Sequence, residues 1–178
     1  MIASRAIGGM LLALALGSPV AATRAQVLQP SQCRAAETVV YSCRFGASVG
    51  SLCGSKGKLS YRFGPAGRAA IDIASDAKWS NVRTGTVIGG GGGRQNYARF
   101  NRDGYDYVVF EATAGQLTDV PGKRWSGIHV QQGDKDVSTL ECKGRATLLR
   151  GGFSDLSRFK PAGVEDTEDT DPRFDMWF

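Results

Sequence analysis

Short runs in which every second residue is apolar, each ended by turn residues, limit this chain to a β fold. In residues 37–45, an apolar side chain stands at every second position from Val39 to Phe45. A period of two places alternate side chains on opposite faces of a strand, so one face is buried. The same reasoning predicts strands over 49–53, 59–63, 69–73, 86–88, 96–100, 105–111, 126–132 and 136–142.

The turns between these runs indicate antiparallel pairing. Asp103-Gly104 separates two of the runs, and an Asp-Gly pair is a strong hairpin signal because both residues tolerate positive φ. Parallel neighbours would need long crossover connections. We therefore expect an all-β fold, an antiparallel sandwich or small barrel of about eight strands.

Four cysteines, Cys33, Cys43, Cys53 and Cys142, predict disulfide staples. Four cysteines allow three pairings, and sequence alone does not choose among them. We favour Cys43 with Cys53, because they end one predicted strand and close the next across a short turn. That choice leaves Cys33 with Cys142. A zinc site is disfavoured because no C-x-x-C motif occurs and His129 is the only histidine, so we expect no metal and no cofactor.

The first residues predict export. Arg5 precedes an apolar stretch that reaches Val20, too short to span a bilayer, and small residues follow at two candidate cleavage points. We favour a signal peptide over 1–25, a β domain over 26–150 and a partly disordered acidic tail over 151–178. The expected location is periplasmic or secreted, which suits disulfides. We expect no transmembrane segment in the mature chain.

Removing that segment lowers the formal charge from +5 to about +3, so the mature chain is only mildly basic. A modest charge and an extracytoplasmic location argue against nucleic acid as a partner.

Three motifs suggest catalysis or ligand binding, and none has its required context. Ser48 lies in a G-x-S-x-G pattern, but a strand follows it, and His129 is the only available base. The glycine run 89–93 lacks the phosphate-loop pattern and no helix follows it. The acidic run 165–171 lacks the glycine and distal glutamate of a calcium loop. We therefore expect no enzyme activity.

Arginine and tyrosine are interleaved just after the glycine run, at Arg94, Tyr97, Arg99 and Arg102. These residue types often dominate protein interfaces, so we predict a partner-binding surface here. The alternative is that Tyr97 belongs to the core and that the arginines are ordinary solvated residues.

Several motifs carry a resemblance to known proteins, namely Tyr41-Ser42-Cys43, Ser51-Leu52-Cys53, Tyr61-Arg62-Phe63-Gly64, the glycine run, 105–109 and Leu140-Glu141-Cys142. Over 33–142 the chain resembles a family of uncharacterised exported proteobacterial proteins, which implies a periplasmic location. It also resembles, more distantly, the periplasmic inhibitors of C-type lysozyme, small disulfide-containing β-barrels. Their Ser-Gly-x-x-Tyr loop would correspond to 92–97, which lacks the serine, so their inhibitory residues are not carried over.

These observations favour a non-enzymatic binding or inhibitor domain that uses 89–102 against a protein partner in the cell envelope, such as a cell-wall hydrolase. The alternatives are a structural envelope protein without inhibitory activity and a hydrolase with Ser48 as nucleophile.

Overall fold

The computed structural model describes residues 30–165 and 167–178. The predicted signal peptide and its cleavage point lie outside these residues. Within the described part, the predicted all-β fold is confirmed, with two antiparallel five-stranded sheets.

The first sheet is a meander closed by a late strand. Its order is β10-β1-β2-β3-β4, and every pair is antiparallel. The strands are β1 (Thr38–Phe45), β2 (Ser48–Ser55), β3 (Lys58–Pro65), β4 (Ile71–Ala74) and β10 (Thr147–Leu148). Tight turns after Phe45 and Ser55 place β1, β2 and β3 side by side.

The second sheet follows chain order without interruption, β5-β6-β7-β8-β9. Its strands are β5 (Val82–Ile88), β6 (Arg94–Arg102), β7 (Tyr105–Thr113), β8 (Arg124–Gln132) and β9 (Lys135–Glu141). The β6–β7 hairpin turns at Asp103-Gly104, as the sequence predicts, and both residues have positive φ.

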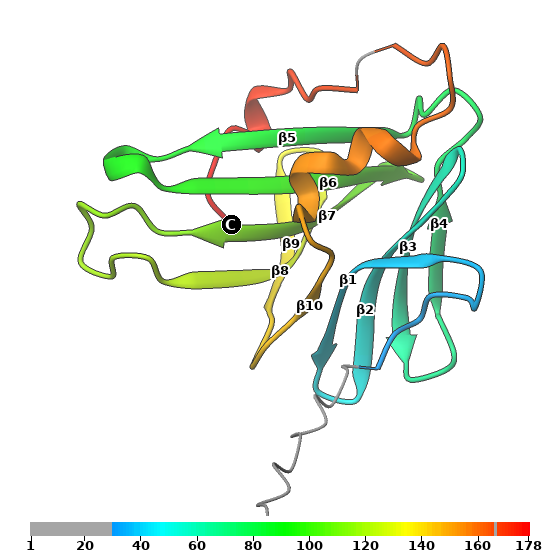
Figure 1. Ribbon diagram of the computed structural model, residues 1–178, viewed down its shortest axis with the longest axis horizontal. Helices are drawn as coiled ribbons and strands as arrows, with labels where there is room; N and C mark the ends of the chain where they lie inside the picture. Colours follow the sequence, from blue (N-terminus) through cyan, green and yellow to red (C-terminus); the bar gives the residue numbers. More distant parts are fainter. Residues whose placement is uncertain (1–29, 166) are drawn as a thin grey trace, which may run out of the picture.

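The two sheets form a sandwich in which their strands run at a steep angle to each other (Figure 1). The main core lies between them and joins side chains such as Leu52 and Tyr61 with Phe100 and Val109. The 3-10 helix η2 (Gly152–Phe159) closes one margin of this core with Phe153, Leu156 and Phe159.

The predicted disulfide pairing, Cys43 with Cys53 and Cys33 with Cys142, is wrong. The disulfides are Cys33–Cys53 and Cys43–Cys142. In an antiparallel hairpin the end of the second strand returns to the start of the first, so Cys53 lies opposite Val39 while Cys43 lies opposite Gly50. The two cysteines of the hairpin are thus too far apart along it to bond.

The expectation of a partly disordered tail also needs correction. Residues 167–178 lie along the outer face of the second sheet, the face turned away from the main core. They include the 3-10 turn η3 (Pro172–Phe174), and the ring of Phe174 is fully buried. Because Phe174, Trp177 and Phe178 pack in a second apolar cluster with Val108 and Phe110 on that face, the acidic segment is anchored.

Candidate functional site

The β5–β8 strands extend past the first sheet and end in two projecting loops (Figure 1). We call residues 88–94 and 114–124 the apex. One loop contains the 3-10 turn η1 (Gly90–Gly92), and the other connects β7 to β8. Three large apolar side chains are exposed here, with 61% of Ile88, 88% of Leu117 and 48% of Val120 accessible to solvent.

Hydrogen bonds fix both loops and join them. Gly89 N donates to Gly93 O at 2.9 Å, which closes the first loop. Ala114 N donates to Lys123 O at 2.8 Å, which closes the second. Gln116 N donates to Gly91 O at 2.9 Å and ties one loop to the other. The exposed side chains therefore stand on a preorganised frame.

Glycines are required where the loops meet. Gly91 has a φ of 69°, in the left-handed region that glycine adopts without strain. A Cβ on Gly115 would collide with the backbone of Gly91, and one on Gly89 would collide with the ring of Trp177. The glycine run thus serves close backbone approach and leaves room for the tail, which supports the apex from the sheet's outer face.

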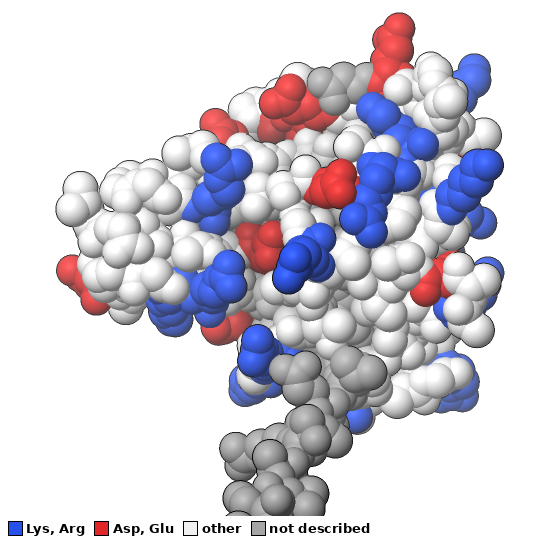
Figure 2. Space-filling view, viewed as in Figure 1, with Lys and Arg blue, Asp and Glu red and all other residues white. Residues whose placement is uncertain are grey.

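The apex has a mostly uncharged tip, and positively charged side chains lie behind the tip. Arg94, Lys123 and Arg124 are exposed, and Asp119 is the one acidic residue within the apex ranges. Figure 2 shows a mostly uncharged tip with basic side chains behind it. Such a surface is complementary to an acidic concave partner.

The four residues predicted to bind a partner do not share one surface. Arg94 is exposed at the start of β6, and Arg102 is exposed at its far end. Tyr97 and Arg99 lie between them under the tail, where burial and the nearby Asp169 carboxylate raise the pKa of Tyr97. Only Arg94 belongs to the apex, and partner binding by these residues stays a prediction.

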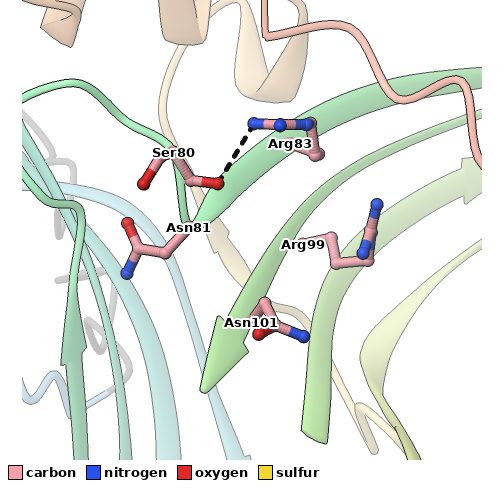
Figure 3. Close-up of a pocket in the computed structure, with 5 residues that line it drawn as sticks. All are labelled: Ser80, Asn81, Arg83, Arg99 and Asn101. Atoms are coloured by element: carbon pink, nitrogen blue, oxygen red, sulfur yellow. Dashed lines mark hydrogen bonds between the residues drawn. The ribbon is translucent and has the colours of Figure 1, made fainter. Parts of the chain in front are cut away.

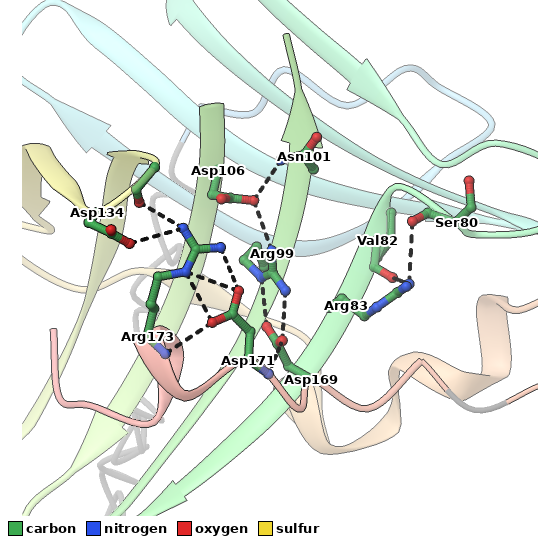
Figure 4. Close-up of polar contacts among 11 residues, drawn as sticks. Ser80, Val82, Arg83, Arg99, Asn101, Asp106, Asp134, Asp169, Asp171 and Arg173 are labelled. Atoms are coloured by element: carbon green, nitrogen blue, oxygen red, sulfur yellow. Dashed lines mark hydrogen bonds and ion pairs between the residues drawn. The ribbon is translucent and has the colours of Figure 1, made fainter. Parts of the chain in front are cut away.

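Arg99 is the centre of an ion-pair network that holds the tail (Figure 4). Its Nε and Nη2 donate to both oxygens of Asp169 at 2.6 Å, and its Nη1 donates to Asp106 Oδ1 at 2.9 Å. The guanidinium also lies 4.2 Å above the centre of the Phe174 ring. The Arg99 guanidinium is therefore paired with two carboxylates and holds the tail on the sheet.

A hollow of about 380 Å³ opens beside this network (Figure 3). It is lined by Ser80, Asn81, Arg83, Arg99 and Asn101. Arg83 Nη1 donates to the backbone carbonyl of Val82 at 2.9 Å, and the Asn101 amide donates to Asp106. The side chains of this hollow therefore make structural contacts, and the apex is the stronger candidate site.

The structure does not bring together the residues of the hydrolase hypothesis. Ser48 begins β2 in the first sheet, whereas His129 lies on β8 under the tail. His129 Nδ1 is 2.8 Å from Thr139 Oγ1, and its ring stacks on Phe178 with centres 4.7 Å apart. His129 is therefore a packed residue of the outer face.

The buried position of His129 beneath the tail predicts that the stability of the protein depends on pH. Burial lowers its pKa below the ordinary value of 6.5, and the Asp136 carboxylate, 3.3 Å from Nε2, opposes this only in part. Because the folded state disfavours the protonated imidazole, protonation favours unfolding. The free energy of unfolding is therefore unaffected by His129 above about pH 6.5 and decreases as the pH falls below that value. Urea unfolding of wild type and His129→Gln at pH 7.5 and 5.5 tests this. Wild type should lose more stability on acidification, and equal losses would contradict the account.

No protein-family model, curated protein or solved structure matches this chain. The resemblances drawn from its motifs therefore stay predictions. Within residues 30–165 and 167–178, no helix is long and apolar enough to cross a membrane. The two disulfides are compatible with an exported protein.

Sequence reasoning missed the second apex loop. Residues 114–123 separate two predicted strands by more than a tight hairpin needs, and they include Leu117 and Val120 among turn-forming residues. A long loop between neighbouring antiparallel strands is a signal of function in compact domains. The length of this loop and its apolar side chains are the sequence signals from which this part of the apex can be predicted.

Proposed function

We propose that this protein is an exported, non-enzymatic binding domain that inserts its apex into the acidic cleft of a partner protein, and that the partner is a glycan-cleaving cell-wall hydrolase. The observation that carries this proposal is the 88% exposure of Leu117 on a loop fixed by hydrogen bonds. Grouped apolar side chains at a projecting point are typical of interaction sites.

Preorganisation supports the proposal energetically. Ordering flexible loops on binding opposes association, and the hydrogen bond from Gln116 N to Gly91 O removes part of that cost before binding. Burying a leucine side chain completely contributes roughly 1.5–3 kcal/mol. Leu117 is thus a suitable central contact.

Charge supports the choice of partner. Most glycoside hydrolases carry a pair of catalytic carboxylates in their substrate cleft. The apex carries the exposed Arg94, Lys123 and Arg124 against one acidic residue, Asp119, so its net charge is complementary to such a cleft. Occupying the cleft would block access of the glycan to the carboxylates.

Inhibition of lysozyme tests the proposal. The purified protein should slow the clearing of a bacterial cell suspension by a lysozyme of the C, G or I type. Leu117→Ser should weaken that inhibition about tenfold or more, because the lost burial corresponds to at least that change in affinity. The matched control is Val137→Ser on β9, a side chain 49% exposed and outside the apex, which should inhibit as wild type does.

Two results would contradict the proposal. One is a wild-type protein that leaves all three lysozyme types fully active. The other is a Leu117→Ser variant that inhibits as well as wild type does.

A further inference from the structure

Residues 167–178 contact the second sheet in the way that a bound peptide contacts its receptor. At the edge strand β5, Thr84 N donates to Thr167 O and Asp169 N donates to Thr84 O, both at 2.8 Å. This is a short parallel bridge between β5 and the tail. Adding a segment to a sheet edge through main-chain bonds is a common mode of peptide recognition.

Further along, buried side chains of the sheet bind the main chain of the tail. The Gln95 amide is fully buried, and its Nε2 donates to Met176 O at 2.8 Å while its Oε1 accepts from Phe178 N at 3.0 Å. Trp125 Nε1 donates to Phe178 O at 3.1 Å. A buried amide that makes two bonds to a neighbouring main chain is arranged to hold an extended peptide.

Three side chains of the tail give the contact its specificity. The Asp169 carboxylate is fully buried against Arg99, and such charge-assisted pairs with two parallel bonds are strongly directional. The ring of Phe174 is fully buried beneath the same guanidinium. The Phe178 ring packs on Tyr97, Phe110 and His129. The groove thus selects a carboxylate followed by spaced aromatic rings.

Residues 160–165, which lead from η2 toward the tail, make few contacts with the rest of the described protein. Residues 160–165 are exposed or half-buried, and only Val164 packs at the margin of the main core. Their described hydrogen bonds are local, such as Val164 N to Pro161 O at 3.3 Å and Lys160 Nζ to Glu165 O at 3.0 Å. The tail therefore docks as a unit separate from its connection.

We propose that the outer face of the β5–β9 sheet is a peptide-binding groove for an acidic, aromatic segment, and that residues 167–178 of a second copy of this chain occupy it by segment exchange. Residues 167–178 are a segment of the chain itself whose fit to the groove is defined contact by contact. When the connection opens, the same bonds form between two copies. The proposal does not depend on the function of the apex.

A full-length receiver variant, Phe174→Ala/Phe178→Ala, tests the groove, because its substitutions lie only in the tail. The probe is a synthetic, fluorescently labelled peptide of residues 167–178, followed by anisotropy. The receiver should bind it at least about tenfold more tightly than wild type does, since the wild-type groove is already occupied. A folded receiver that does not bind the peptide would overturn the proposal.

Two altered peptides separate specific recognition from general charge attraction. Asp169→Asn should bind the receiver roughly 30-fold more weakly, because it leaves Arg99 buried with one partner fewer. Asp175→Asn makes the same chemical change at an exposed position and should bind as the unaltered peptide does. Equal weakening by both would contradict recognition at Arg99.

A separate experiment tests whether the tail of one copy binds the groove of another. A full-length donor variant, Gln95→Leu, keeps the tail sequence and weakens its own groove. Donor and receiver mixed in equal amounts should sediment as a one-to-one complex, whereas each alone should sediment as a monomer. Monomers in the mixture would overturn exchange.

Wild type provides a measurement that needs no substitution. Excess unlabelled peptide added to ¹⁵N-labelled wild type should displace the tail and move the Phe178 amide signal to an unbound position. An unchanged signal at large excess would overturn the proposal even if the receiver variant fails to fold.

Discussion

Replacing Cys43 and Cys142 together by alanine is expected to lower the free energy of unfolding by about 4–5 kcal/mol. This disulfide closes a loop of 99 residues and joins β1 of the first sheet to Cys142, which directly follows β9 of the second. In the chain-entropy model, a crosslink over about 100 residues stabilises the folded state by roughly 4.7 kcal/mol. A loss of this size is a large fraction of the stability of an ordinary domain.

The other disulfide provides the matched control. Cys33–Cys53 closes only 20 residues, so the double alanine variant should lose roughly 3 kcal/mol. Guanidinium unfolding of both variants and wild type measures the difference. If removing Cys33–Cys53 proved more costly than removing Cys43–Cys142, the long crosslink would not be the main staple between the sheets.

Arg99→Leu is expected to cost about 3–5 kcal/mol. The substitution leaves the Asp106 and Asp169 carboxylates buried without their shared cation, and breaking a buried ion pair from one side carries a penalty of this size. It also removes the guanidinium above Phe174. Urea unfolding measures the effect, and the tail should show the largest gain in hydrogen exchange.

Arg102→Leu on the same strand is the control for this prediction. Arg102 is 51% exposed and pairs with the exposed Asp103, so its loss should cost no more than about 1 kcal/mol. Adding Asp106→Asn and Asp169→Asn to Arg99→Leu should recover part of the stability, because no buried charge then lacks a partner. Equal costs for Arg99→Leu and Arg102→Leu would contradict the buried network.

Several strands were predictable from sequence because apolar residues recur at every second position, which is the period of a strand. β1, β3 and β7 show this pattern clearly, and the Asp103-Gly104 turn fixes the β6–β7 hairpin. The start of β5 was missed. Arg83 and Thr84 are polar because β5 is an edge strand whose outer neighbour is the tail, a partner that local periodicity does not reveal.

The cysteine pairing and the tail depend on contacts between distant parts of the chain. A pairing based on nearness in sequence ignored the return of β2 alongside β1, which places Cys53 near the start of the hairpin. The acidic residues of the tail suggested a solvated run, yet Asp169 pairs with Arg99 seventy positions earlier. The composition of the tail does not reveal that the tail is ordered by contacts with the second sheet, whose residues lie far from it in the sequence.

Mapping where a hydrolase contacts this protein tests the proposed role of the apex. The ¹⁵N-labelled chain is titrated with unlabelled C-type lysozyme, and its amide signals are followed by NMR. We expect shifts concentrated in residues 88–94 and 114–124, with the shift of the Leu117 amide among the largest. An absence of shifts, or shifts centred on β9 or on the tail, would contradict that role.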